Sequence, residues 1–281
     1  MTFIIHGATG AQGAPIFSLL HAAGHDAIAA VRDTAKVDGK AVSVDFDSAA
    51  SLAEAYQGAD GVFVHLPLGS PDQQVTFATA IGDAVAKARP KRVVFSTSGY
   101  PLTLPDGTST AHGILHDRLE KSGVAYAVIA PKTFLENLLL PVTLDPARIE
   151  GKLRYPIRED YAISWISHLD MADIAVQLLT DNVGVQGVVT AGALPALLGD
   201  DLAEGFSAHL NTPVTFESQN PDDYGKLITP LFGAAGVEPV IASYHARWSM
   251  PDERIDESRS AQTLLGISPR SVAQWLRDTG I

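Results

Sequence analysis

Short apolar runs alternate with amphipathic stretches through the first half of the chain. Each run is nearly continuous, without alternating polar residues, which is typical of strands that helices cover on both faces. We predict such strands over residues 3–5, 27–31, 62–64, 93–95 and 125–130. A sheet built from them is expected to be parallel, because enough chain for a helix separates consecutive strands.

The stretches between these strands carry the start and stop signals of helices. The first predicted helix has apolar residues at helical spacing and ends at Gly24. The second begins at the capping box of residues 70–73 and ends before Pro90, and the third covers residues 110–122. Strands and helices in this alternation connect through right-handed crossovers, so the sequence predicts a doubly wound α/β sheet of the Rossmann type.

The second half of the chain has a less regular pattern. A capping box at residues 167–170 predicts a helix as far as residue 179, and Val188 and Val189 predict a further strand. Past Gly192 we predict helices over residues 200–210 and 221–231, an extended segment over 213–217, and a last helix that starts at Ser268.

A glycine-rich turn joins the first predicted strand to the first predicted helix. Its sequence is Gly7-Ala8-Thr9-Gly10-Ala11-Gln12-Gly13, a G-x-x-G-x-x-G spacing where G-x-G-x-x-G is commoner. Glycines allow a tight turn, close approach of a phosphate to the backbone, and close packing of the helix on the strand. The free N–H groups of the helix start favour an anion. We predict that this turn holds the pyrophosphate of a dinucleotide; the alternative is a purely structural turn.

The residues after the second predicted strand distinguish between two dinucleotides. An acidic side chain there binds a ribose 2′-hydroxyl, whereas an arginine favours a 2′-phosphate. Arg32 comes first after the apolar run and Lys36 lies nearby, which predicts NADP(H) as the cofactor. Asp33 argues against NADP(H), because its carboxylate would repel the phosphate if it turned inward. The alternative is a solvent-facing pair of Arg32 and Asp33 that binds nothing.

These observations predict two parts of the chain. We expect a dinucleotide-binding core over residues 1–135, completed by about 163–192, and a smaller substrate-binding lobe made mostly of residues 136–281. The length of 281 residues fits this division, since one domain takes about 100–200 residues. With 46% hydrophobic residues, the chain is not of the disordered class.

The charge and residue composition restrict partners and location. Lys and Arg total 20 against 32 Asp and Glu, a net charge of −12, so nucleic acid is not expected as a direct partner. Cysteine is absent, which excludes disulfides, thiolate nucleophiles and cysteine metal sites. No apolar run reaches the roughly 18 residues of a membrane span, and the first residues lack the basic start of a signal peptide. We expect a cytoplasmic protein that acts on a small molecule, with a homodimer as the assembly to consider.

Four motifs occur in an order that resembles a known family. They are Gly7-Ala8-Thr9-Gly10-Ala11-Gln12-Gly13, Val31-Arg32-Asp33, His116-Asp117-Arg118-Leu119-Glu120 leading into Ser122-Gly123-Val124-Ala125-Tyr126, and Phe134-Leu135-Glu136-Asn137. Through them the chain resembles the NmrA-like branch of the atypical short-chain dehydrogenases/reductases. Within that branch it is most similar to the type-2 NAD(P)H:quinone oxidoreductases and triphenylmethane reductase.

The resemblance implies which residues would bind NADP(H) and which would border the substrate. Thr9, Gly10 and Gln12 would contact the pyrophosphate, and Arg32 would contact the 2′-phosphate. Asp45 and Phe46 would flank the adenine, and His65 and Leu66 would approach the ribose or nicotinamide. The residues that would border the nicotinamide and substrate are Ser96, Thr97, Ser98, Pro131, Phe134 and Asn137. All of them follow predicted strands, and open α/β sheets bind their ligands at the carboxyl ends of strands.

The proton-transfer pair of the classical short-chain dehydrogenases is absent. None of the seven tyrosines is followed by a lysine four positions later, so the chain has no Tyr-x-x-x-Lys. Alignment with relatives puts His116 at the lysine position and His112 at the tyrosine position, with Ser98 14 residues before His112. We predict that His112, His116 and Ser98 form the catalytic group, with His112 as an acid and His116 also in contact with the ribose. The alternative is a partly buried helix face with satisfied imidazoles.

Metal and serine-hydrolase chemistry are not predicted. His112 and His116 have the spacing of two zinc ligands, yet no HExxH glutamate and no cysteine completes a set. The chain also has no G-x-S-x-G motif, which a serine hydrolase of the α/β type would need.

The missing tyrosine restricts the class of acceptor. An unactivated ketone needs a proton as hydride arrives, and general acid catalysis is worth about 10²–10⁴-fold. A quinone or dye takes hydride into a delocalised system and needs far less help. We therefore predict an NADPH-dependent oxidoreductase that reduces an electron-poor conjugated acceptor such as a quinone or dye. Two alternatives stay open: a non-catalytic NADP(H)-sensing regulator of the NmrA type, and a specialised-pathway reductase of an imine or enone.

Overall fold

The computed structural model describes all 281 residues, and the chain divides into two compact units. The first comprises Met1–Pro131, His168–Ala191 and Glu257–Ile267, and the second comprises Lys132–Ser167, Gly192–Asp256 and Ser268–Ile281. This division differs in detail from the expected one. Residues 132–135 and 163–167 belong to the second unit, and residues 257–267 return to the first.

A seven-stranded parallel sheet forms the centre of the first unit. Its strands are β1 (Thr2–His6), β2 (Asp26–Val31), β3 (Ala41–Ser43), β4 (Gly61–His65), β5 (Arg92–Ser96), β6 (Ala125–Pro131) and β10 (Gly187–Ala191). They lie in the order β10-β6-β5-β4-β1-β2-β3, and every neighbouring pair is parallel. The apolar runs that predicted the strands are almost fully buried, as expected for strands covered on both faces.

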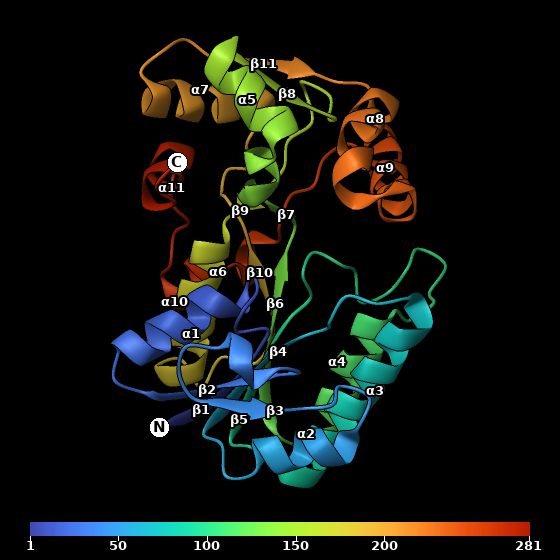
Figure 1. The fold of residues 1–281 in the computed structure, drawn as a ribbon, viewed down its shortest axis with the longest axis vertical. Helices are drawn as coiled ribbons and strands as arrows, with labels where there is room; N and C mark the ends of the chain where they lie inside the picture. The colour runs from blue at the N-terminus through green and yellow to red at the C-terminus, as the bar shows by residue number, and fades with distance from the viewer. The chain divides into compact units, whose positions relative to one another are not determined.

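Helices cover both faces of this sheet (Figure 1). Helices α1 (Gly13–Ala22) and α6 (His168–Thr180) pack together on one face. Helices α2 (Ala49–Tyr56), α3 (Pro71–Ala88) and α4 (Ala111–Ser122) form a row on the other face. The short elements of this unit are η1 (Thr34–Lys36), η3 (Glu257–Arg259) and α10 (Ala261–Leu265). The predicted doubly wound α/β sheet is confirmed.

Local sequence signals account for where these helices begin and end. The Ser70 hydroxyl accepts the Gln73 N–H, and the Gln73 side chain accepts the Ser70 N–H at 2.9 Å, so the predicted capping box opens α3. The Thr110 hydroxyl accepts the Gly113 N–H at the start of α4. Gly123, with φ +67°, ends the same helix in the left-handed region.

The strand order reverses at β1, and this reversal positions the candidate site. Strands β2 and β3 follow on one side of β1, whereas β4 and β5 lie on the other side. Open α/β sheets bind their ligands at such a reversal, outside the carboxyl ends of the strands. His6, His65 and Ser96 are the last residues of β1, β4 and β5, so all three lie at that edge.

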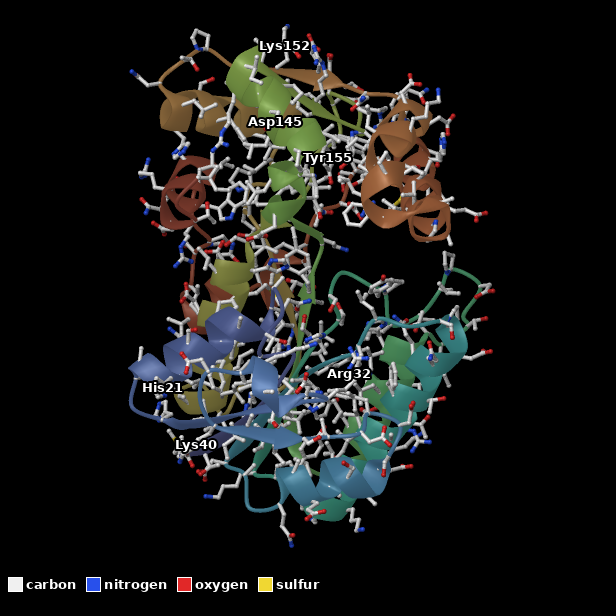
Figure 2. All side chains as sticks on the ribbon, viewed as in Figure 1. His21, Arg32, Lys40, Asp145, Lys152 and Tyr155 are labelled. Carbon is white, nitrogen blue, oxygen red and sulfur yellow. The ribbon has the colours of Figure 1, made fainter.

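The second unit contains two small parallel sheets and five helices. Strand β8 (Lys152–Tyr155) pairs with β11 (Thr215–Ser218), and β7 (Thr133–Phe134) pairs with β9 (Trp165–Ile166). The remaining elements are η2 (Leu135–Leu139), α5 (Pro141–Ile149), α7 (Gly199–Leu210), α8 (Pro221–Phe232), α9 (Ala234–Ser249) and α11 (Val272–Asp278). Its core includes Tyr155 (Figure 2), whose ring meets those of Tyr224 and Tyr244 edge to face.

The sequence misses part of this unit. The last helix begins at Val272 and not at Ser268, because the Ser271 hydroxyl accepts the Gln274 N–H at 3.2 Å and caps it there. Helix α9 is not predicted, since Gly233 precedes it and offers no side-chain cap, whereas Asn220 caps α8. The predicted helices over residues 200–210 and 221–231 are confirmed as α7 and α8.

Contacts with β10 and the residue before it place residues 257–267 in the first unit. Ser260 forms a bridge with Thr190 of β10. Arg259 donates from its guanidinium to the carbonyl oxygens of Val188 and Gln186, at 3.0 and 2.9 Å. These contacts span about 70 residues of sequence, so no local pattern announces them. Throughout the chain, no helix has both the length and the apolar character needed to cross a bilayer.

Candidate functional site

The turn after β1 has a backbone that requires glycine at two positions. Gly7 has φ +61°, and a Cβ there would lie 2.2 Å from Nε2 of His65. A Cβ on Gly13 would lie 2.3 Å from the Gly7 carbonyl oxygen, so α1 packs directly on the turn. The Gly10 N–H donates to the same oxygen at 2.7 Å. The motif glycines therefore form a tight, closely packed turn at the carboxyl end of β1.

This turn presents unpaired N–H groups at the start of α1. The backbone N–H groups of Ala11 and Gln12 have no hydrogen-bond partner in the protein. Thr9 and Gly10 are exposed beside them, and the first turn of α1 contains no acidic residue. A helix start of this kind combines free donors with partial positive charge. The residues present therefore fit a pyrophosphate, although the chain as a whole is acidic.

Arg32 is an exposed cation directly after β2 (Figure 2). Its guanidinium has no ion-pair partner in the structure. Asp33 is held by its own turn: its carboxylate accepts the Ala35 N–H at 3.1 Å and lies 3.8 Å from Nζ of Lys36. The alternative pair of Arg32 and Asp33 is therefore not formed. Arg32 is free to bind an anion, whereas Lys36 is partly neutralised.

Phe46 and Asp45 lie beyond β3 and near the end of β1. The buried Phe46 ring meets the His6 ring edge to face at 5.1 Å and the Phe77 ring at 6.4 Å. Asp45 is exposed, and its carboxylate accepts the Asp47 N–H at 3.0 Å. The structure thus brings both residues to the edge that carries the glycine turn, and their contact with an adenine stays a prediction.

Gln12 does not extend its side chain toward solvent as a phosphate ligand would. Its amide reaches from the glycine turn to the end of β5, where its oxygen accepts the Ser96 hydroxyl at 2.7 Å. Its nitrogen donates to the Ser98 hydroxyl oxygen at 2.9 Å. Thr97 is buried between the two serines, and its N–H donates to the Ile129 carbonyl at 3.0 Å. Three predicted site residues are thereby tied to one another.

Burial keeps His65 neutral, and a hydrogen bond to the backbone determines which ring nitrogen carries the proton. Nδ1 lies 3.2 Å from the Leu66 carbonyl oxygen, which can only accept, so Nδ1 holds the proton. Nε2 is buried beside Gly7 without a partner. Burial is the main cause that lowers the pKa of His65. At the glycine turn His65 therefore contributes an acceptor atom and no positive charge.

His112 is stacked between two aromatic rings. The Tyr100 ring lies 4.8 Å away at 12°, and the Phe95 ring lies 6.1 Å away at 16°. Burial, with a smaller effect of His65, lowers the pKa of His112 to about 4. At neutral pH His112 carries no imidazolium proton, which argues against its predicted role as a general acid. The half-exposed Tyr100, whose role the sequence does not indicate, shares this stack.

His6 and His168 complete a group of four neutral imidazoles at this edge. Burial lowers the pKa of His6 to about 3 and that of His168 to about 4, with His65 as the second cause in both. The Tyr56 hydroxyl lies 2.7 Å from Nε2 of His6. Sequence analysis missed both histidines as members of the site. Their positions in the chain could have indicated them, because His6 directly precedes the glycine turn and His168 begins α6.

The structure does not bring His116 to this group. Its ring meets Tyr126 at 5.7 Å, and the Tyr126 hydroxyl lies 3.4 Å from its Nε2. Tyr126 is in register with Val93, three residues before Ser96 at the carboxyl end of β5. His116 therefore packs against a strand residue that lies three positions before the carboxyl edge. Its ribose contact stays a prediction that this position does not favour.

The remaining predicted residues fall into both units. Pro131 is the buried last residue of β6 in the first unit. Phe134 lies in β7 and Asn137 in η2, both in the second unit. Their contacts with nicotinamide or substrate stay predictions. No group of three or more His, Asp and Glu side chains is arranged to hold a metal ion.

Comparison with known proteins now adds the family. A family model described as NmrA-like matches residues 1–262. The chain belongs to the NmrA-like family. The NAD(P)H azoreductase of Xenophilus azovorans is 31% identical over 220 residues, which cover 76% of this chain and 75% of that protein.

Two solved structures share the fold of this NmrA-like chain. The triphenylmethane reductase of Citrobacter sp. superposes with a TM-score of 0.81 at 14% identity, over 100% of both chains. The NADPH-dependent quinone oxidoreductase of Escherichia coli, solved in complex with NADPH, has a TM-score of 0.73 at 18% identity, again over 100% of both chains. At these identities the likeness concerns the fold alone.

The buried imidazoles should make this NmrA-like protein sensitive to acid. An unfolded histidine titrates near pH 6.5, whereas folded His112 and His168 titrate at about 4. The unfolded chain therefore binds more protons between these values. Stability that is present above pH 6.5 is lost as the pH falls toward 4, by about 3 kcal/mol for each imidazole. Denaturant unfolding near pH 7.5 and near pH 5 measures about 2 kcal/mol of this loss for each imidazole.

Two variants separate titration from packing. His112→Phe keeps a ring between Phe95 and Tyr100, so its free energy of unfolding should fall less between the two pH values than that of the wild type. Phe95→Leu removes packing from the same stack without changing a titrating group. Its free energy of unfolding should therefore lie below that of the wild type by the same amount at both pH values. An identical pH dependence in His112→Phe and wild type would contradict this account of His112.

Proposed function

We propose that this NmrA-like protein is an NADPH-dependent reductase that transfers hydride to an electron-poor conjugated acceptor such as a quinone, azo compound or dye. The observation that carries this proposal is the glycine turn with unpaired N–H groups, beside an Arg32 without a partner. A pyrophosphate fits the turn, and a 2′-phosphate fits Arg32.

The names of the relatives support the cofactor and the reaction class. The related azoreductase is named for NAD(P)H, and the quinone oxidoreductase of the same fold was solved with NADPH. When bound, NADPH would supply a hydride from its dihydronicotinamide ring and become NADP⁺. A quinone or azo acceptor would take the hydride with its two electrons and one proton from water, whereas a cationic dye would be neutralised by the hydride alone.

The protein would mainly bind, orient and exclude water. Ala11 and Gln12 would hold the pyrophosphate through backbone N–H groups, and Arg32 would hold the 2′-phosphate. His65 would offer its Nε2 lone pair to a ribose hydroxyl, because a neutral acceptor suits a hydroxyl and not a phosphate oxygen. The stacked rings of Tyr100 and His112 would form an apolar wall at the carboxyl edge.

The neutral edge favours acceptors that need little acid catalysis. Burial lowers the pKa of His6, His65, His112 and His168, so none of them supplies an imidazolium proton at pH 7. A simple ketone would lose about 10²–10⁴-fold without a general acid. A quinone, azo compound or cationic dye delocalises the incoming electrons. The cytoplasmic location and the homodimer stay predictions from the sequence.

NADPH oxidation with a panel of acceptors tests the reaction. We expect loss of NADPH absorbance with quinones, azo dyes or triphenylmethane dyes, and much slower loss with simple ketones. Tight NADPH binding without oxidation by any acceptor would favour the NADP(H)-sensing regulator. Turnover limited to imines or enones would favour the specialised-pathway reductase. Absence of binding in calorimetry with NADPH and NADH would overturn all three.

Arg32→Glu tests the assignment of NADPH. Loss of a charge-assisted hydrogen bond to the 2′-phosphate, worth about 1.5–3 kcal/mol, should raise the Kd of NADPH by about 10–100-fold. NADH lacks this phosphate, so its Kd should change far less. Lys87→Glu makes the same charge change on the exposed last turn of α3 and serves as the control. Equal effects of Arg32→Glu on both nucleotides would mean that Arg32 does not contact the 2′-phosphate.

A further inference from the structure

One side chain links the glycine turn to the two serines after β5. Gln12 lies half-buried at the start of α1, and its amide spans the distance to Ser96 and Ser98, more than 80 residues away in the chain. Ser96 is fully buried. A buried polar contact between two loops with no other role would be costly compared with an apolar side chain of the same size. A functional role for the hydrogen bonds of Gln12 with Ser96 and Ser98 would explain why this polar contact is present.

Ser98 has a backbone conformation that serine seldom adopts. Its φ is +54°, in the left-handed region. The other non-glycine residues with positive φ, Arg89 and Asn211, are both the C-caps of helices, where a left-handed residue is the usual ending. Ser98 ends no helix. Strain of this kind persists only where the surroundings impose it, and it concentrates at functional sites.

The hydrogen bonds around Ser98 leave one donor unused. The Ser96 hydroxyl donates to the Gln12 amide oxygen and accepts the Ser98 N–H at 3.2 Å. The Gln12 amide nitrogen donates to Ser98 Oγ. With its oxygen already accepting from Gln12, the Ser98 hydroxyl has its own proton left over, and no acceptor for it lies within the protein. The proton is available to a bound molecule.

We infer that Gln12 is a positioning residue, which holds the Ser98 hydroxyl so that its proton points at the oxygen or nitrogen of the acceptor where negative charge develops. This inference rests on the proposed function, because it needs a hydride acceptor at the carboxyl edge. The Gln12 side chain is then not a ligand of the pyrophosphate. The backbone N–H of Gln12 remains available to that group.

Glutamine is the side chain that can perform this role. It must accept from Ser96 and donate to Ser98 with one rigid, planar group. Glutamate has the same length and accepts from Ser96, yet it has no proton for Ser98. Methionine fills a similar volume and makes neither hydrogen bond. Comparison of these two substitutions separates the orientation of Ser98 from the packing of the turn.

The effect on turnover tests the inference. Gln12→Glu, Gln12→Met and Ser98→Ala should each lower kcat with a quinone by about tenfold, the effect of one lost hydrogen bond in the transition state. The KM for NADPH should stay within about twofold, because no phosphate contact is lost. If Gln12 acts through Ser98, the double variant Gln12→Met with Ser98→Ala should be no slower than Ser98→Ala alone.

Ser98→Gly distinguishes a role of Ser98 in turnover from a purely structural role. Glycine accepts a positive φ without strain, so this variant should melt at a higher temperature than the wild type and still lose about tenfold in kcat. Arg89→Gly relieves the strain of a positive φ in the same way at the C-cap of α3, and it should leave kcat unchanged. If Ser98 had only a structural role, Ser98→Gly would raise the melting temperature and leave kcat unchanged.

The outcomes distinguish this inference from the proposed function. A wild-type protein that binds NADPH but reduces no acceptor overturns both. Turnover in the wild type, with kcat unchanged in Ser98→Ala or in Gln12→Glu, overturns the positioning role alone. A rise in the KM for NADPH in Gln12→Met with unchanged kcat also overturns it, and returns the side chain to the pyrophosphate. Additive losses in the double variant mean that Gln12 does not act through Ser98.

Discussion

Unpaired backbone N–H groups at the start of α1 are the interaction on which the proposed cofactor site depends. A chain with a net charge of −12 has no general attraction for an anion. The close packing of Gly7 and Gly13 holds strand, turn and helix together, and the N–H groups of Ala11 and Gln12 in this turn have no partner in the protein. Local dipoles thereby replace net charge, and Arg32 adds a cation that its neighbour Asp33 does not neutralise.

The strand order then determines what else can meet an anion held at this turn. Parallel strands place all their carboxyl ends at one edge, so His6, His65 and Ser96 arrive beside the turn from three different strands. The same packing that builds the sheet also buries these imidazoles and removes their charge. The histidines of this edge are therefore neutral at pH 7, and Arg32 supplies a positive charge directly after β2.

The sequence predicts most of the first unit because its signals there are local. Apolar runs mark the strands, and Ser70, Thr110 and Gly123 mark helix ends through contacts within a few residues. Site properties that depend on distant contacts could not be predicted. The bond from Gln12 to Ser98 and the low pKa of His112 arise from residues that meet only in the folded chain. The start of α11 at Val272 was not predicted, because the hydroxyl that caps this helix belongs to Ser271 and not to Ser268, three residues earlier.

Because the histidines at this edge are neutral, the kind of acceptor that the site would favour depends on the hydroxyl of Ser98. Hydride that reaches a quinone or azo compound leaves negative charge on an oxygen or nitrogen, and neutral imidazoles offer no opposite charge to it. Delocalisation within the acceptor spreads this charge, and a hydroxyl proton can stabilise what remains. Because Gln12 and the backbone already hold Ser98 in place, its hydrogen bond would need no reorganisation as the charge develops. An acceptor that requires a complete proton in the transition state would gain little from such a donor, so under the proposed function conjugated acceptors would suit this site better than simple ketones.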